Sequence, residues 1–171
     1  MTRLPLLALT ALLLSPATWG AELSLQVEVP RLKVAEYHRP YLAVWIEDDS
    51  RRSHGSLAVW YDVGMADGEG QKWLKDLREW WRRDGRGLSF PVDGVTSATR
   101  APGRHTVTFK ADHPQLAALP PGDYLLAVEA AREVGGRERL TLPFTWPPAD
   151  ATSADAQGTQ ELGAVRLTSS P

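Results

Sequence analysis

The sequence predicts a mainly β protein, an antiparallel β-sandwich with one inserted amphipathic helix. Two observations predict this fold. Most apolar residues beyond residue 20 fall into short runs separated by turn-forming Gly, Pro, Asp and Ser, which is typical of strands. Only one stretch, residues 71–84, repeats its apolar residues at spacings of three and four, as an amphipathic helix does. A length of 171 residues suits a single domain, expected at 22–171, and a targeting segment.

The first twenty residues have the composition of a secretory signal peptide. Arg3 is the only charged residue, an apolar run occupies 4–14, and small residues surround the end of the segment. The run is too short to span a membrane, and no cysteine follows it for lipid attachment. We therefore predict export to the periplasm, cleavage near Gly20 or Ala21, and a mature protein that does not itself span a membrane.

Charge and cysteine content exclude several classes of function. Without Arg3, the 19 Lys and Arg fall to 18 against 21 Asp and Glu, a net charge of −3, which does not suit nucleic-acid binding. The chain has no cysteine, so thiolate-bound iron–sulfur clusters, attached c-type haem and disulfide exchange are impossible. Its four histidines lack the spacing of metal ligands, and we predict no metal site.

The first half of the domain predicts three strands and the helix. Apolar and polar residues alternate over 22–29, and further strands are expected at 41–47 and 56–63, joined by a polar turn. The helix at 71–84 places five large apolar residues on one face, which we expect to pack on a sheet. These are Trp73, Leu74, Leu77, Trp80 and Trp81. The same tryptophans offer an alternative role as a stacking surface for a flavin.

The second half predicts four more strands, at 105–110, 123–131, 140–146 and 161–167, the last as a closing edge strand. A Pro-Gly-Asp-Tyr start, alternating apolar residues and a Gly-Gly turn follow one another here. This order resembles the end of many immunoglobulin-like sandwiches. Residues 147–159 are rich in Pro, Ala, Ser, Thr and Gln and predict a flexible segment.

The stretch with the clearest chemical pattern is Asp93-Gly94-Val95-Thr96-Ser97-Ala98-Thr99-Arg100. Its small residues and its glycine suit an exposed, adaptable loop that presents a threonine hydroxyl. Arg100 lies next to that threonine in sequence, where a guanidinium is able to pair with a phosphate. An ordinary polar turn between two strands is the alternative interpretation, because Asp-Gly is a common turn dipeptide.

This pattern, an acid, two free positions, Thr or Ser, a small residue and then Ala-Thr, resembles the acceptor motif of periplasmic FMN transferases of the ApbE type. The resemblance implies FMN linked through its phosphate to Thr99, with Asp93, Thr96, Ser97 and Ala98 forming the rest of the motif. Ser97 departs mildly from the pattern, since many relatives carry glycine there.

A wider resemblance covers nearly all of the mature chain. The segments 38–48, 72–77, 80–83, 93–99 and 123–133 together resemble the predicted periplasmic proteins called domain of unknown function 2271. That family implies a secreted protein, often encoded near FMN transferases and PepSY-type membrane reductases, with no assigned activity.

These observations predict a periplasmic electron carrier with covalent FMN on Thr99, which is a substrate of an FMN transferase rather than a catalyst. It would relay electrons between a membrane reductase and a periplasmic acceptor, and the family resemblance makes a PepSY-type reductase one candidate partner. A cofactor-free binding module is the alternative, with His38, Arg39, Arg51, Arg52 and the tryptophan-rich helix as its partner surface. An enzyme acting on a small periplasmic substrate is a third interpretation. The sequence contains no nucleophile elbow, phosphate loop or dinucleotide fingerprint.

Overall fold

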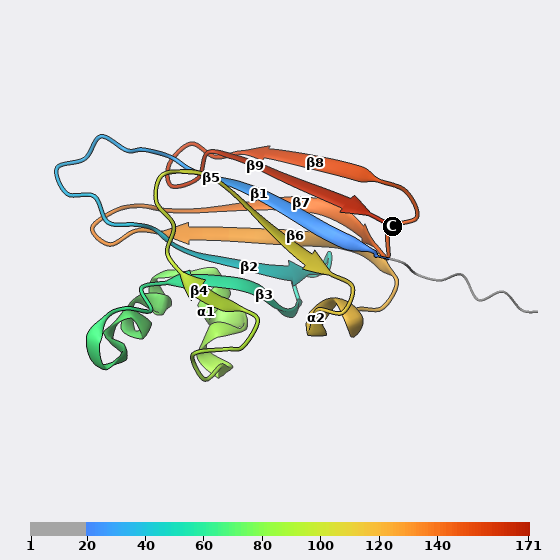
Figure 1. Ribbon diagram of the computed structural model, residues 1–171, viewed down its shortest axis with the longest axis horizontal. Helices are drawn as coiled ribbons and strands as arrows, with labels where there is room; N and C mark the ends of the chain where they lie inside the picture. The colour runs from blue at the N-terminus through green and yellow to red at the C-terminus, as the bar shows by residue number, and fades with distance from the viewer. Residues whose placement is uncertain (1–19) are drawn as a thin grey trace, which may run out of the picture.

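Two β-sheets pack face to face and form the body of the protein (Figure 1). The computed structural model describes residues 20–171, so the predicted signal peptide lies outside the described residues except for Gly20. Sheet A has the strand order β5-β1-β9-β8, and sheet B has the order β4-β3-β2-β6-β7. The predicted mainly β sandwich is therefore confirmed.

The described residues form nine strands and four short helical segments. The strands are β1 (Glu22–Val29), β2 (Tyr41–Glu47), β3 (Ser53–Tyr61), β4 (Thr96–Ala98), β5 (Gly103–Lys110), β6 (Gly122–Ala131), β7 (Arg137–Trp146), β8 (Thr152–Gln157) and β9 (Ala164–Ser170). The helical segments are η1 (Ala66–Asp76), α1 (Arg78–Arg83), η2 (Gly85–Gly87) and α2 (Pro114–Ala117).

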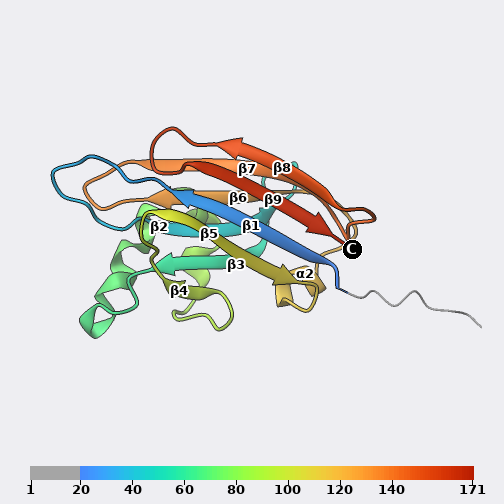
Figure 2. The same cartoon turned by 45° about the horizontal axis from the view of Figure 1, so that its top comes forward.

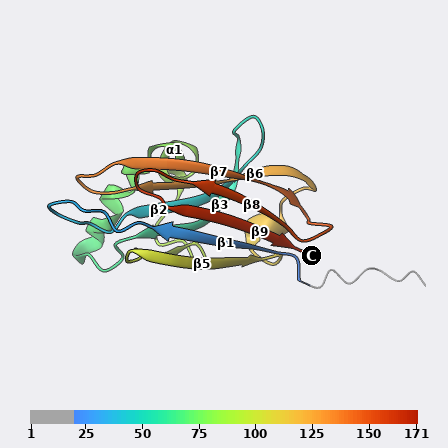
Figure 3. The ribbon, with the colours of Figure 1, turned by 90° about the horizontal axis from the view of Figure 1, so that it is seen from above.

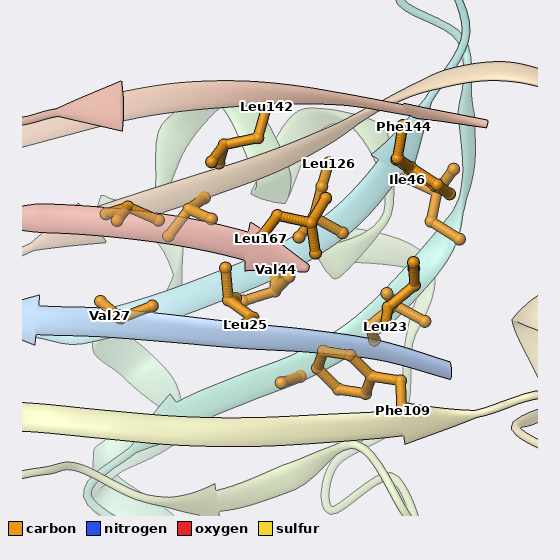
Figure 4. Close-up of a cluster of buried hydrophobic side chains, with 14 of the residues drawn as sticks. Leu23, Leu25, Val27, Val44, Ile46, Phe109, Leu126, Leu142, Phe144 and Leu167 are labelled. Carbon is orange, nitrogen blue, oxygen red and sulfur yellow. The ribbon is translucent and has the colours of Figure 1, made fainter. Parts of the chain in front are cut away.

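The main core fills the space between the two sheets (Figure 4). Alternate residues of β1 point inward, and Leu23, Leu25 and Val27 are fully buried, as the alternating sequence predicts. They meet Val44 and Leu126 of sheet B across the core. Burial of such side chains contributes about 1.5–3 kcal/mol each, so this layer is the main source of stability.

A second, smaller core lies on the outer face of sheet B. The central strand β2 is buried on both faces, which explains its unbroken apolar run Leu42-Ala43-Val44-Trp45-Ile46. The segments η1, α1 and η2 cover this outer face (Figure 1), where Leu74, Leu77 and Trp80 are fully buried. The predicted structural role of these three residues is confirmed.

The prediction of one continuous helix over 71–84 is wrong. The chain forms the 3₁₀ segment η1, leaves helical geometry at Leu77 with φ −74° and ψ 70°, and starts again as α1. The buried Glu129 carboxylate accepts the backbone N–H groups of Glu79, at 3.1 and 3.2 Å, and Trp80, at 2.9 Å. Because a new helix start leaves its first N–H groups free, this carboxylate stabilises the break. Burial raises the pKa of Glu129, and these N–H groups and Arg137 oppose that shift.

Two predictions about the C-terminal part are also wrong. The segment 147–159 contains the regular strand β8, which pairs with β9 from Thr152 to Gln157. The last strand, β9, is three residues later than expected and lies between β1 and β8 rather than at an edge (Figures 2 and 3). Its alternate residues Val165 and Leu167 are buried in the core.

Glu138 on β7 organises the loop that connects β8 to β9. Its carboxylate accepts four consecutive backbone N–H groups, those of residues 159–162, at 2.7–2.9 Å. Partial burial favours its neutral form, but the four donors together hold the pKa of Glu138 below its usual value. This contact fixes the loop of sheet A to the edge strand of sheet B.

Candidate functional site

The Asp93–Thr99 stretch begins with a tight turn. The Val92 carbonyl accepts the backbone N–H groups of Val95 at 3.2 Å and Thr96 at 2.9 Å, and the Thr96 hydroxyl at 3.0 Å. Gly94 has φ +71°, a conformation that glycine adopts without strain. Asp93 is exposed on this turn, next to Gly94. The turn therefore presents the acid to solvent and engages the Thr96 hydroxyl internally.

The second half of the stretch is an edge strand, and the prediction of a loop is wrong for residues 96–98. Strand β4 pairs in parallel with β3, with Ala98 opposite Tyr61. The backbone N–H of Thr99 then donates to the Tyr61 carbonyl at 3.2 Å. Thr99 is half-buried at the end of this pairing, so its backbone is held by the sheet while its side chain lies at the surface.

Thr99 lies on the wall of a cavity of about 590 Å³ at one end of sheet B. The floor consists of residues at or just beyond the ends of four strands, and the segments that follow β3 form a side wall. The lining residues are Tyr37, His38, Arg39, Tyr41, Asp62, Val63, Gly64, Met65, Trp73, Asp76, Ala98, Thr99, Ala131 and Glu133. This volume is in the usual range for cofactor and ligand sites, about 300–1,000 Å³.

The structure brings some of the predicted site residues to this cavity and not others. Ala98 and Thr99 line it, whereas Asp93, Thr96 and Ser97 do not. The guanidinium of Arg100 lies 5.2 Å from the ring centroid of Trp60, a residue of the core between the sheets. Arg100 does not line the cavity, and its pairing with a phosphate on Thr99 stays a prediction.

His38 and Arg39, predicted as part of a partner surface, lie instead at the same cavity as Thr99, together with Glu133, which the sequence did not indicate. His38 lies 3.1 Å from a Glu36 carboxylate oxygen and 3.6 Å from one of Glu133, and Arg39 lines the cavity beside it. The run His-Arg-Pro-Tyr at the start of β2 was the available signal, since polar residues at strand ends often line sites.

Of the three tryptophans that offered a stacking surface, Trp73 alone lines the cavity. Trp80 is fully buried, and Trp81 packs beside it with ring centroids 6.1 Å apart. The structure therefore divides the predicted aromatic face into a packed part, formed by Trp80 and Trp81, and one accessible ring, Trp73.

The cations of the alternative partner surface do not gather in one place. His38 and Arg39 precede β2, whereas Arg51 and Arg52 lie in the turn after β2, at the opposite end of the strand (Figure 3). Residues 20–171 contain no group of three His, Asp or Glu side chains placed to hold a metal ion. Within that same part of the chain, no helix is long and apolar enough to cross a membrane.

Comparison with known proteins identifies a protein family for the chain. Searches among curated proteins and among solved structures found nothing similar to the chain. The family profile described as predicted periplasmic protein, DUF2271, matches residues 22–164, which is nearly all of the part that the structure describes. This match agrees with the predicted periplasmic location, and the chain belongs to the DUF2271 family of predicted periplasmic proteins.

Proposed function

We propose that the protein is a periplasmic flavoprotein, with FMN attached covalently to Thr99, that relays electrons between a membrane reductase and a periplasmic acceptor. The observation that carries the proposal is the position of Thr99. It is the last residue of the acceptor-like motif, and it lies on the wall of the 590 Å³ cavity. Because the Thr99 hydroxyl lies next to this cavity, an FMN group attached to it is able to bind in the cavity of the same protein.

The attachment is a phosphoryl-group transfer to the Thr99 hydroxyl. A bond forms between Thr99 Oγ1 and the phosphorus of FMN, supplied by a dinucleotide donor that contains FMN. The phosphoanhydride bond of the donor breaks, a nucleoside monophosphate leaves, and the threonine proton passes to a base of the transferase. Parallel pairing with β3 holds the backbone on one side, while the exposed turn at Asp93 is available for contact with the transferase.

The residues around the cavity fit a flavin. The walls combine aromatic and aliphatic groups, such as Tyr41, Trp73 and Met65, with charged groups. The charged groups are Arg39, Asp62, Asp76 and Glu133. Flavin sites use this combination to cover the ring and to orient its polar edge. When bound, the flavin supplies the electron-transfer chemistry, and the protein supplies the attachment, the cover and the neighbouring charges.

The first test is co-expression with an ApbE-type FMN transferase in the periplasm. The purified protein is expected to be yellow, and its intact mass is expected to rise by one FMN less one water. The flavin is expected to remain attached after denaturation, because the bond is covalent. A wild-type protein that stays unmodified, in a host that fully modifies a known acceptor, would contradict the proposal.

Matched variants of the same motif make this test specific. Thr99→Ala is expected to abolish modification, and Thr99→Ser to retain part of it because the hydroxyl is kept. Ser97→Ala is the control, since it removes the neighbouring hydroxyl on β4 and is expected to leave modification intact. Asp93→Ala is expected to reduce modification without unfolding the protein, because this side chain is exposed and outside both cores.

A cofactor-free binding module is the second candidate, and one observation favours it. Three large apolar side chains that line the cavity, those of Val63, Met65 and Trp73, are exposed. Exposed apolar surface of this kind marks binding sites in general. An unmodified protein that still binds a partner or a small molecule at this cavity would support this candidate.

A further inference from the structure

The cavity beside Thr99 is elongated across the strands of sheet B. Thr99 follows β4 at one side, Asp62 follows β3, Tyr41 begins β2, and Ala131 ends β6 at the other side. Neighbouring strands lie about 4.8 Å apart, so these three steps span roughly 14 Å. A long ligand attached at Thr99 therefore has a floor that leads away from the attachment point.

The side wall of the cavity carries a group of exposed apolar side chains. Trp73 is 37% exposed, Met65 is 39% exposed and Val63 is 51% exposed, and all three line this one cavity. They are three of only five exposed large hydrophobic residues among residues 20–171. Isolated exposed hydrophobics are common, but a group around a concave site indicates a surface that an apolar ligand covers.

The aromatic groups of the cavity are held in place by the fold. The hydroxyl of Tyr41 donates to the Gly70 carbonyl at 3.0 Å, which fixes the floor to η1. Gly70 itself packs directly on the Asp62 carbonyl, where an added Cβ would lie only 2.0 Å from that oxygen. The neighbouring Leu74 is fully buried in the second core. Because these contacts hold both Tyr41 and the segment that carries Trp73, a ring binds with little loss of side-chain freedom.

Charged groups line the cavity at both sides: Asp62 lies after β3 beside Thr99 and Asp76 lies at the end of η1 on the side wall, whereas the one arginine of the lining, Arg39, lies at the side farthest from Thr99. His38 lies between Glu36 and Glu133, with Arg39 next to it. The cavity thus has an apolar part, formed by Val63, Met65 and Trp73, and a polar end away from Thr99 where its histidine and arginine lie. An isoalloxazine ring has the same division, since its dimethylbenzene part is apolar and its pyrimidine-dione part has hydrogen-bond donors and acceptors.

We propose that this cavity binds the isoalloxazine ring itself, with Trp73 and Tyr41 as its aromatic contacts and with His38, Arg39 and Glu133 next to its pyrimidine edge. The inference rests on the proposed function for the source of the flavin. The proposed ring site is separate from Thr99, the attachment residue. Binding of the ring therefore does not require a bond to Thr99.

The test uses lumiflavin, which has the ring without the phosphate or the sugar-alcohol chain, and the Thr99→Ala protein, which has no attachment hydroxyl. Lumiflavin is expected to bind saturably, with quenching of its fluorescence because a tryptophan ring lies against it. Adding Trp73→Ala is expected to weaken binding about tenfold or more, as loss of a stacking aromatic does. Trp73→Phe keeps an aromatic ring and is expected to retain most of the affinity.

Val134→Ala is the matched control. Val134 is 87% exposed at the β6–β7 turn and does not line the cavity, so its loss is expected to leave lumiflavin binding unchanged. Absence of saturable binding to the Thr99→Ala protein would overturn the ring site, even if wild-type Thr99 is flavinylated. Equal loss of binding in the Trp73→Ala and Val134→Ala variants would also overturn it. Binding without any flavinylation of Thr99 would support the ring site and contradict the proposed function.

Discussion

Replacement of Trp80 by alanine is expected to lower the free energy of unfolding by about 3–5 kcal/mol. The side chain is fully buried in the second core, and its ring centroid lies 6.0 Å from that of Phe90. Its indole N–H donates to the Ser56 hydroxyl at 2.8 Å. The substitution therefore opens a large cavity and removes a buried hydrogen bond, and both effects destabilise the covering of sheet B.

Denaturant unfolding, with extrapolation to water, measures this loss. Trp80→Phe restores most of the ring volume and is expected to cost clearly less than Trp80→Ala. Trp73→Ala, in the preceding segment η1, is the control, and because that ring is 37% exposed its cost is expected to be well below that of Trp80→Ala. Equal midpoints for wild-type and Trp80→Ala proteins would contradict the packing of α1 on the sheet.

Breaking the buried ion pair between Arg132 and Glu161 is expected to cost about 3–5 kcal/mol. The pair is bidentate, with Nε–Oε2 and Nη2–Oε1 distances of 3.0 and 3.1 Å, and both side chains are buried. The Gly136 N–H also donates to the same carboxylate at 2.7 Å. Arg132→Met leaves a buried carboxylate without its cation, and the desolvation of that charge is the physical cause of the loss.

A double-mutant cycle separates this cause from simple loss of packing. The double variant Arg132→Met/Glu161→Leu removes both charges, and we expect it to be more stable than Arg132→Met alone. Additive effects of the two substitutions would show that the pair is not coupled. The pair connects the β6–β7 turn to the β8–β9 loop, so it holds the two sheets together near the candidate site.

Elements whose own residues alternate in step with their burial were predictable. Strand β1 alternates apolar and polar residues because one face meets the core, and its predicted bounds of 22–29 agree with the structure. The break in the predicted helix was not predictable in this way. Its cause, the Glu129 carboxylate, lies on β6, about fifty residues after α1 in the sequence.

Strand β8 was missed for a related reason. Its sequence Thr-Ser-Ala-Asp-Ala-Gln has only two small apolar residues, Ala154 and Ala156, and both face the main core. Backbone pairing with β9 makes this segment a strand, although its composition does not predict one. The neighbouring contact of Glu138 with residues 159–162 likewise depends on tertiary structure.

In the candidate site, too, one feature was predictable from the sequence and another depends on tertiary structure. The position of Thr99 at the end of the motif was evident from the residues, but its cavity was not, since the floor combines residues from the ends of four strands. The side of β4 on which Arg100 lies depends on pairing with β3, and that pairing places its guanidinium over Trp60. The sequence pattern gave no indication of this contact between Arg100 and Trp60.

The most direct measurement of the central proposal is fragmentation mass spectrometry of the tryptic peptide that spans residues 87–100, from protein co-expressed with an FMN transferase. Cleavage after Arg86 and Arg100 isolates this peptide, which contains the hydroxyls of Ser89, Thr96, Ser97 and Thr99. The proposal predicts the added mass of FMN less water on Thr99 alone. An unmodified peptide, or an FMN group on any other residue, would contradict it.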